Sequence, residues 1–312
     1  MKSLPIHSEA FNAILVGFEA DLKARNKCVT AIYSLPICLR EFFHYLESKG
    51  YENLIGVTTT IVTAYYQYLS TRKNQRRGGA LSNGSLNKHQ YALRMLLNYL
   101  KDTGARFSFG VHLRNEKPNT IDVKQILTQE QIKELFDACD YSHLSEAIRL
   151  RDKAILVMLY SCGLRRGEAE AINLADVDFN KRRILITKGS GNKKRTTPYV
   201  AINDYNLEIL QDYLNYSRPQ FYRSSQTDAF FVNKNGKRLD GQTFMSRVKT
   251  IVKATENNAI IEKHITPHSL RHSIATHLLQ NGLSIKKVGD FLGHKSIDAT
   301  QIYTQIAEQL NA

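Results

Sequence analysis

The sequence contains little cysteine, and its four cysteines are spread along the chain at Cys28, Cys38, Cys139 and Cys162. None forms a C-x-x-C pair, and their spacing matches no zinc-binding pattern. This argues against a metal site held by thiolates. Cys139 and Cys162 stand in apolar helical stretches, so we expect them to be buried free thiols.

Long apolar runs are also lacking. No stretch approaches the roughly 20 apolar residues that a transmembrane helix requires, so we expect no membrane partner. The N-terminal stretch MKSLPIHSEAFNAILVGFEADLK carries Glu19 and Asp21 and alternates polar with apolar residues. That pattern is typical of an amphipathic helix rather than a secretory signal. We therefore predict an intracellular protein located in the cytoplasm.

Acidic residues are scarce relative to basic ones. The 43 Lys and Arg exceed the 29 Asp and Glu, which gives a formal net charge of +14. Residues 1–120 hold 16 basic and 8 acidic residues, and the remainder holds 27 and 21, so both parts are basic. A polyanionic partner such as nucleic acid would explain this balance. A basic soluble protein without such a partner has the same composition.

The chain is predicted to form two domains joined by a linker, because 312 residues suffice for two buried cores. Residues 1–103 show helical periodicity only. Residues 104–127 have no sustained periodicity and are predicted to be the linker. Residues 128–312 form the second domain, which opens with a capping-box spacing between Thr128 and Gln131.

The helical first domain carries three local signals. Ser8 precedes an apolar helical face and is a candidate N-cap. Pro36 is expected to kink a helix or to mark its first turn. The loop TRKNQRRGGALSNGS, residues 71–85, is basic and rich in glycine. It is compatible both with contact to a phosphate backbone and with a solvated flexible loop.

The second domain is predicted to be mixed. Helices are expected to about Asn173, after which the period changes. RRILITKGSGNKKRTTPYVAI, residues 182–202, is typical of a β-hairpin, and AFFVNKNGKRL, residues 229–239, indicates another short strand with an Asn-Gly turn. Helices follow to the end. The predicted fold class is therefore mainly α, with an all-helical N-terminal domain and a small antiparallel β-sheet in the C-terminal domain.

Four short motifs in the second domain carry candidate functional residues. In YSCGLRRGEAEAI, Arg165 lies where one helix ends and another begins, a place from which its guanidinium can bind an anion. Pairing with Glu168 at the surface is the alternative. In ITKGSGNKKR, the basic residues stand on a hairpin turn where each is able to contact phosphate; they are Lys188, Lys193, Lys194 and Arg195. Lys188 differs because it ends the strand itself.

The other two motifs lie near the C-terminus. In ITPHSLRHSIATHLLQNG, Pro267 and Gly282 mark the two ends of a helix, and His268 and Arg271 share one face of its first turns. His272 and His277 are expected to point elsewhere on the helical wheel. In DFLGHKSIDATQIYTQI, His294 follows Gly293 at a helix end, and Tyr303 follows nine residues later.

This set of side chains suits one kind of chemistry. A phenol has a pKa near 10 and is a weak nucleophile at neutral pH. It can attack a phosphodiester when fixed cations stabilise the negative charge that builds on the non-bridging oxygens. Arginine suits that task because its planar fork matches phosphate oxygens and keeps its charge. A lysine or histidine can protonate the departing alkoxide. We therefore expect no metal and no other cofactor.

The order Arg165, Lys188, His268-x-x-Arg271, His294, Tyr303 resembles that of the tyrosine recombinases, also called phage-type integrases. GLRRGE, HSLRHSIATHLLQNG and LGHKSIDATQIYT are similar to the three most recognisable motifs of that family. The resemblance covers essentially the whole chain. It implies a helical core-binding domain that contacts DNA, a linker and a catalytic domain.

The resemblance also implies a role for each residue. Arg165 and Arg271 would hold the scissile phosphate, and His268 and His294 would add hydrogen bonds and assist proton transfer. Lys188 would be the general acid for the 5′-hydroxyl, with Lys193 and Lys194 as alternatives. Tyr303 would become linked to the 3′-phosphate. Arg166 stands where relatives often have an aliphatic residue, so we expect it to face solvent or DNA.

Assembly follows from the same resemblance. The family works as a homo-tetramer on double-stranded DNA that carries specific recombination sites, and accessory proteins belong to many such systems. Ile306 and Leu310 are four residues apart and form an apolar stripe that is expected to dock on a neighbouring subunit; a frayed terminus is the alternative. The layout is closer to the compact Xer-like or mobile-element recombinases than to enzymes with a further arm-binding domain.

Two other functions use the same residues or the same fold. A type IB topoisomerase-like enzyme would cleave and reseal one duplex as a monomer with little sequence preference. A DNA-binding regulator without activity would tolerate loss of the phenol of Tyr303. The complete set of six residues argues against the regulator, and the site-specific recombinase is the favoured function. Relaxation of supercoiled plasmid, measured together with tetramer formation, separates it from the topoisomerase.

Overall fold

The computed structural model of the protein describes residues 4–74, 78–117, 123–187, 195, 197–294, 300–301, 303–304 and 306–307. The chain divides into two compact units, Met1–Thr120 and Ile121–Ala312. The boundary between the units falls inside the stretch 104–127 that the sequence marks as a linker.

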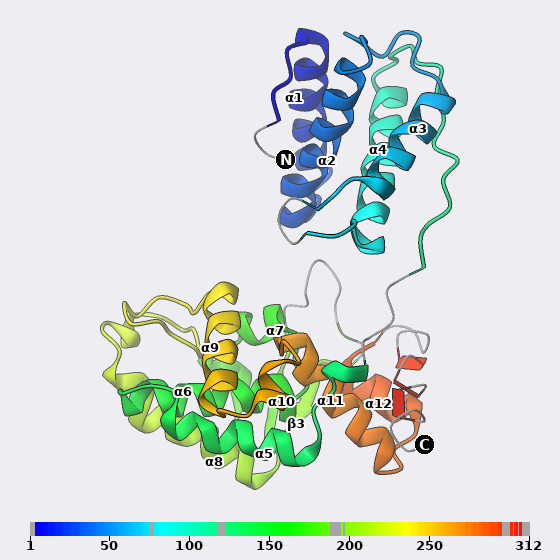
Figure 1. Ribbon diagram of the computed structural model, residues 1–312. Helices are drawn as coiled ribbons and strands as arrows, with labels where there is room; N and C mark the ends of the chain where they lie inside the picture. Colours follow the sequence, from blue (N-terminus) through cyan, green and yellow to red (C-terminus); the bar gives the residue numbers. More distant parts are fainter. Residues whose placement is uncertain are drawn as a thin grey trace. The chain divides into compact units, whose positions relative to one another are not determined.

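The described residues of the first unit form four α-helices (Figure 1). They are α1 (Glu9–Ala24), α2 (Val29–Glu47), α3 (Thr59–Thr71) and α4 (Asn83–Asp102). The predicted cap of α1 is confirmed, because Ser8 Oγ accepts a hydrogen bond from the N–H of Phe11 at 3.1 Å. Of the two expectations for Pro36, the first turn of a helix is wrong, and a kink stays a prediction. Pro36 lies well inside α2, where it has no N–H to donate to the carbonyl of Ile32.

Aromatic side chains fill the core of the first unit. Phe11 of α1 stacks on Phe43 of α2 with ring centroids 4.7 Å apart, and Phe42 packs against Tyr65 of α3 at 5.0 Å. All four are fully buried. The beginning of the predicted linker joins this core, since the buried ring of Phe109 lies 6.4 Å from that of Phe42. The packing unit therefore extends beyond the predicted domain end at residue 103.

The second unit is mainly helical. Its α-helices are α5 (Gln129–Ala138), α6 (Glu146–Leu156), α7 (Arg166–Ala171), α8 (Asp204–Asp212), α9 (Gly241–Ala254), α10 (Asn258–Ile261), α11 (Pro267–Gln280) and α12 (Ile285–Leu292). A π-helical turn, Val157–Ser161, continues α6, and a second one, Tyr213–Ser217, continues α8. The capping box of α5 is confirmed, because the side chains of Thr128 and Gln131 bond reciprocally to each other's backbone N–H.

A three-stranded antiparallel sheet completes this unit. β1 (Val177–Asp178) pairs with β2 (Arg183–Leu185), and β2 pairs with β3 (Tyr199–Ala201). The hairpin predicted for residues 182–202 is thus confirmed, although its turn, residues 188–194, lies outside the described residues. The strand predicted within residues 229–239 is wrong. This segment forms only isolated bridges, Asn173 with Ala229 and Val232 with Arg238. The strand that pairs with the hairpin is β1, which the sequence did not predict.

Two hydrophobic clusters lie in the second unit. The larger one gathers the buried side chains of α5, α6, α8 and α9, and the rings of Tyr213, Phe230, Phe231 and Phe244 contact one another within it. The smaller one joins α11, α12 and the C-terminal segment; its buried members are Ile126, Ala275, Val288, Leu292, Tyr303 and Ile306. Ile306 therefore packs on its own chain here, and Leu310 lies outside the described residues.

The cysteines are free thiols, as expected. Cys28 is exposed, and the other three are buried. Burial raises the pKa of Cys162 to about 12, which suppresses its reactive thiolate form. Among the helices of the described residues, none has the length and apolarity to cross a bilayer.

The aromatic core of the first unit generates a stability prediction. Phe11→Ala removes a fully buried ring and should lower the free energy of unfolding by about 3–5 kcal/mol. Val16→Ala, on the exposed side of the same helix (72% exposed), is the matched control and should change stability by less than about 0.5 kcal/mol. Urea denaturation followed by circular dichroism measures both. Equal effects of the two substitutions would contradict the assignment of Phe11 to the core.

Candidate active site

Arg165 is placed by the break between two helices. The π-helical turn after α6 closes with the N–H of Cys162 bonded to the carbonyl of Val157 at 2.9 Å. Gly163 then adopts a positive φ of 56°, and a Cβ there would lie 2.8 Å from the ring of Phe291. This position therefore requires glycine. The chain re-enters a helix at Arg165, whose extended backbone makes it the N-cap of α7.

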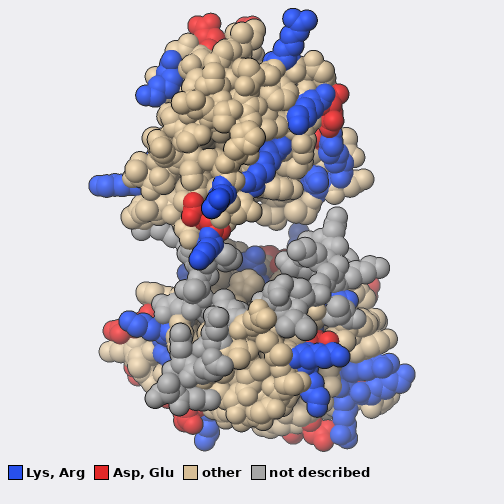
Figure 2. Space-filling view, turned by 90° about the vertical axis from the view of Figure 1, so that its right-hand side faces the viewer, with Lys and Arg blue, Asp and Glu red and all other residues tan. Residues whose placement is uncertain are grey.

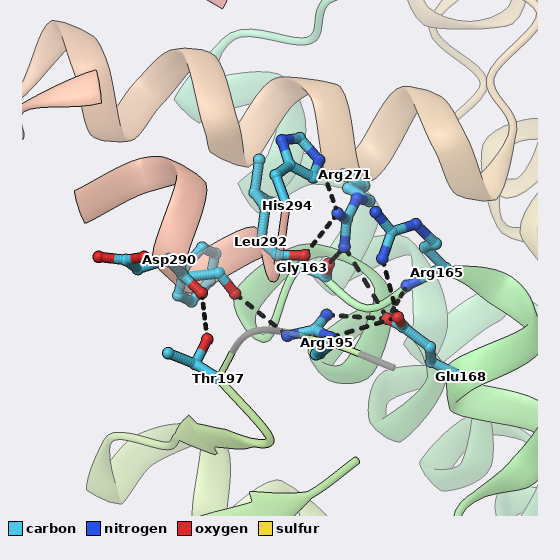
Figure 3. A network of polar contacts seen from close by, with 10 residues as sticks. Gly163, Arg165, Glu168, Arg195, Thr197, Arg271, Asp290, Leu292 and His294 are labelled. Carbon is cyan, nitrogen blue, oxygen red and sulfur yellow. Dashed lines mark hydrogen bonds and ion pairs between the residues drawn. The ribbon is translucent and has the colours of Figure 1, made fainter. Parts of the chain in front are cut away.

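A buried carboxylate organises the arginines (Figure 3). Glu168, 1% exposed, accepts hydrogen bonds from the backbone N–H of Arg165 at 2.8 Å and from its guanidinium at 2.9 Å. Arg195 grips the same carboxylate through two nitrogens, at 3.2 and 2.8 Å. The guanidinium of Arg271 lies 3.9 Å away. Three positive charges thus surround one negative charge. The net positive charge that remains can attract an anion.

The hydrogen-bond partners of Glu168 favour its ionised form. Burial opposes the charged form, but the hydrogen bonds and charge of Arg195, together with Arg165, outweigh it and hold the pKa of Glu168 below its ordinary value. The carboxylate is therefore charged at neutral pH. Sequence reasoning treated Glu168 only as a surface partner of Arg165; its position three residues later on a helix was the available signal.

Arg195 corrects an expectation from the hairpin. The sequence placed it among the basic residues of an exposed turn that contact phosphate. In the structure its side chain is buried, held by Glu168, and donates to the carbonyl of Phe291 at 3.1 Å. It is therefore a structural brace. The spacing of residues along a turn does not reveal which side chain points inward.

Arg271 lies on α11, one turn beyond its start. Pro267 is the first residue of that helix, and Gly282 follows its end with a φ of 82°, so both predicted boundaries are confirmed. Arg271 is 3% exposed and donates to the carbonyls of Gly163 and Leu292, the second at 2.7 Å. Burial, and next the charge of Arg165, lower the pKa of Arg271 to about 9. The guanidinium still carries its charge at neutral pH.

The C-terminal end of α12 binds three side chains from elsewhere in the unit. The carbonyls of Asp290, Phe291 and Leu292 accept hydrogen bonds from Thr197, Arg195 and Arg271 respectively (Figure 3). Carbonyls at a helix end carry partial negative charge and can accept such donors, cationic ones in particular. The carbonyl of Asp290 also accepts from the N–H of Gly293 at 3.0 Å. Gly293 ends the helix with a φ of 66°, and a Cβ there would lie 2.5 Å from the side chain of Arg195.

His294 follows directly and connects the arginines to the C-terminal segment. Its Nε2 lies 3.1 Å from a guanidinium nitrogen of Arg271, and its Nδ1 lies 2.9 Å from Oγ1 of the buried Thr300. Since arginine only donates, Nε2 is the acceptor and Nδ1 carries the proton. Burial and then the charge of Arg271 lower the pKa of His294 to about 4, so the ring is neutral at pH 7.

Tyr303 lies beside this histidine with its hydroxyl facing α11. Its ring stacks over that of His294 with centroids 6.3 Å apart, and its Oη lies 2.8 Å from Nδ1 of His272. The expectation that His272 points elsewhere is therefore wrong. His272 is four residues after His268, so the two share a helix face, and their rings stack at 6.3 Å. That spacing was the signal that sequence reasoning missed.

His268 and His277 have different surroundings. His268 is exposed. Partial loss of hydration around its ring lowers its pKa, and the charges of Arg271, Arg166 and Arg165 lower it further. His277 is buried, and its ring nitrogens lie 2.8 Å from the hydroxyl of Tyr160 and 2.8 Å from the carbonyl of Leu127. It ties α11 to neighbouring segments and, as expected, lies away from the site.

The structure thus brings five of the six predicted residues together: Arg165, Arg271 and His294 are linked by hydrogen bonds or ion pairs, and Tyr303 and His268 join them through ring contacts. Lys188 lies outside the described residues, as do Lys193 and Lys194. Arg166 is exposed, as expected. The arrangement combines an excess of positive charge with a phenol and neutral imidazoles, which suits attack of the phenol on a phosphodiester.

Comparison with known proteins identifies relatives of this chain. Residues 125–309 match the model of the phage integrase family. The chain is 32% identical over 277 residues to the tyrosine recombinase XerD of Bifidobacterium longum, a match that covers 87% of this chain and 85% of the relative. It is 36% identical over 220 residues to the tyrosine recombinase XerC of Alcanivorax borkumensis, covering 69% and 66% of the two chains.

Solved structures share the fold. The XerH site-specific recombinase bound to its palindromic difH substrate superimposes with a TM-score of 0.69, at 23% identity, over 93% of this chain and 80% of that chain. The Tn1549 transposon integrase in complex with transposon right end DNA gives a TM-score of 0.68, at 15% identity, over 96% and 98%.

The buried carboxylate generates a prediction about stability and pH. Glu168→Gln keeps the shape of the side chain but leaves Arg195 buried without its counter-ion, so the free energy of unfolding should fall by about 3–5 kcal/mol at pH 7. Because the folded pKa of Glu168 lies below the ordinary 4.5, its stabilisation is complete above about pH 4.5 and is lost as the pH falls through the folded pKa.

Urea denaturation between pH 3 and 7 measures this effect. The difference between Glu168→Gln and the native chain should shrink at the acid end of the range. Glu208→Gln, at an exposed position of α8, is the matched control and should follow the native chain throughout. A Glu168→Gln variant as stable as this control would show that the arginines do not depend on the carboxylate.

Proposed function

The chain belongs to the phage integrase family and is a tyrosine site-specific recombinase, and we propose a role for each residue of its site. It cleaves and rejoins DNA strands through a covalent link between the enzyme and the 3′-phosphate. The observation that carries the assignment of roles is the convergence of two arginines, two histidines and a buried tyrosine around Glu168 and the end of α12.

Arg165 and Arg271 hold the scissile phosphate in this proposal. Their guanidinium groups share one carboxylate, so both are fixed before any anion arrives. Preorganised cations of this kind stabilise charge that develops in the transition state without rearranging at the moment of reaction. The side chain of Arg165 is 29% exposed and is the more accessible of the two.

Tyr303 is the nucleophile. Burial raises the pKa of its phenol, while the charges of Arg271 and then Arg165 act in the opposite direction. Both charges therefore favour the phenolate form that attacks the phosphate. His294 and His268 add hydrogen bonds to the phosphate and assist proton transfer. Lys188 protonates the 5′-oxygen as it leaves, with Lys193 and Lys194 as the alternatives.

The substrate is double-stranded DNA with specific recombination sites. The basic surface supports this proposal: on the visible face of the first unit in Figure 2, Lys and Arg side chains predominate over acidic ones. Residues 1–103 serve as the core-binding domain, residues 104–127 as the linker and residues 128–312 as the catalytic domain. Contacts to many phosphates supply most of the affinity.

The assembled enzyme is a homo-tetramer that joins two DNA sites. The XerH and Tn1549 integrase structures are complexes with DNA, and the Xer relatives match most of this chain, which supports an Xer-like or mobile-element recombinase. We place it in the cytoplasm with its DNA. Accessory proteins and the direction of the reaction, whether integration, excision, inversion or resolution, depend on the recombination site.

Covalent capture tests the proposed nucleophile. The purified protein is incubated with DNA from its source organism and denatured rapidly in detergent, and the DNA that stays attached is sequenced. The native chain should yield adducts at a few recurring sites, whereas Tyr303→Phe should yield none, because a phenylalanine ring has no oxygen to attack the phosphate. Scattered adducts would favour a topoisomerase-like activity, and the absence of adducts with intact DNA binding would indicate a regulator.

Neighbouring arginines provide a test of phosphate binding. Arg165→Ala should slow cleavage of a captured site by at least about 100-fold, since it removes a preorganised charge from the transition state. DNA affinity should change little. Arg166→Ala, at the adjacent exposed position, is the matched control and should cleave normally. Single-turnover cleavage and gel-shift titration measure the two quantities. Normal cleavage by Arg165→Ala would refute the assigned role.

A further inference from the structure

The hydroxyl of Tyr303 already has a specific partner. Among the described residues, the hydrogen bond of Tyr303 Oη is to Nδ1 of His272, at 2.8 Å. The two rings lie with their centroids 5.5 Å apart, tilted by 44°. His272 is half-buried on α11, directly after Arg271. The atom that must lose a proton during cleavage is therefore in contact with an imidazole nitrogen.

The other two histidines are not placed for this task. His294 stacks on the ring of Tyr303, but its nitrogens lie against Arg271 and Thr300. His268 packs on the ring of His272, with centroids 6.3 Å apart, rather than on the tyrosine. Only His272 directs a nitrogen at the phenolic oxygen within the part of the chain that the structure describes.

At neutral pH the phenol of Tyr303 holds a proton and the ring of His272 has a free nitrogen to accept it. Burial raises the pKa of Tyr303, so the phenolate is scarce at neutral pH and attack requires a base. Burial, and next the charges of His268 and Arg271, lower the pKa of His272 to about 4, so its ring is neutral at pH 7 and able to accept a proton. A base must be within about 2.6–3.2 Å of the proton's atom, and 2.8 Å satisfies this requirement.

We propose that His272 is a catalytic residue that accepts the phenolic proton of Tyr303 as the tyrosine attacks DNA. This inference rests on the proposed function. In the tautomer with its proton on Nε2, Nδ1 receives the proton from Oη. The bond from Oη to phosphorus forms, the bond from phosphorus to the 5′-oxygen breaks, and that oxygen is protonated by the general acid. In the rejoining step His272 returns the proton to the departing phenol.

The cationic groups around the pair oppose a protonated His272 until DNA is bound. His268 and Arg271 flank His272 on α11, while His294 and the charge of Arg165 act from the side of Tyr303. The charges of His268 and Arg271 destabilise an imidazolium at His272. The phosphate that Arg165 and Arg271 hold adds negative charge, which allows the proton to remain on His272 during attack.

His272→Asn is the decisive variant. Its Oδ1 can occupy the place of Nδ1 and accept the same hydrogen bond, but an amide does not take up the proton at neutral pH. The probe is a synthetic duplex of a sequence captured by the native chain, nicked just beyond the cleaved phosphate so that the released fragment diffuses away. At pH 7 the variant should form the covalent adduct at least about 100-fold more slowly.

The pH profile separates proton transfer from positioning. Without a base, attack depends on the phenolate, so the rate of His272→Asn should rise about tenfold per pH unit between about pH 7 and 9, while that of the native chain stays level. His277→Asn, on the same helix but bonded to Tyr160 and Leu127, is the matched control and should keep the native profile even if it is less stable.

Three outcomes would overturn the inference. A native rate in His272→Asn would show that no proton passes to His272, and a uniformly slow variant with the native pH profile would reduce His272 to a positioning role. Restoration of the variant by DNA with sulfur in place of the bridging 5′-oxygen would mean that His272 protonates the leaving group instead. Failure of the native chain itself to form an adduct would overturn the proposed function rather than this assignment alone.

Discussion

The ion cluster around Glu168 is the constraint on which the rest of the site depends. Arginine side chains repel one another, and a phosphate-binding site needs two of them side by side before the phosphate arrives. A buried carboxylate that bonds Arg165 and Arg195 and lies 3.9 Å from Arg271 makes that arrangement stable in the absence of DNA. The cluster retains an excess of positive charge, so it stays receptive to an anion.

The end of α12 extends this constraint to the nucleophile. Its last carbonyls accept hydrogen bonds from Arg195 and Arg271, so the helix is fastened to the same guanidinium groups that surround Glu168. His294 follows immediately and contacts both Arg271 and the ring of Tyr303. Phosphate binding and nucleophile placement are consequently joined through His294, which bonds to Arg271 and stacks on Tyr303.

Much of this was predictable because it depends on local spacing. Helix periodicity, the Ser8 and Thr128 caps, the Pro267 and Gly282 boundaries and the 182–202 hairpin all follow from neighbouring residues, and the structure confirms them. The family is confirmed as well. The roles of Arg165, Arg271, His268, His294 and Tyr303 stay predictions, although the structure brings these residues together.

The errors arose where tertiary packing decides. Pro36 lies mid-helix because α2 packs against both α1 and α4, and burial of its side chains outweighs the loss of one backbone bond. Residues 229–232 are buried in the core, and their backbone pairs through isolated bridges with Asn173 and Arg238 rather than through a continuous strand. The inward turn of Arg195 depends on a carboxylate 27 residues away, which no short window of sequence reveals.

The two hydrophobic clusters of the second unit differ in size, and this has a consequence for motion. Leu164 and Ala169, the neighbours of Arg165 and Glu168, belong to the large cluster, whereas Tyr303 belongs to one with six buried members among the described residues. Regions with few buried apolar contacts open at a lower free-energy cost than the main core of a protein. Separating the ring of Tyr303 from its cluster should therefore cost less free energy than displacing the backbone that carries Arg165.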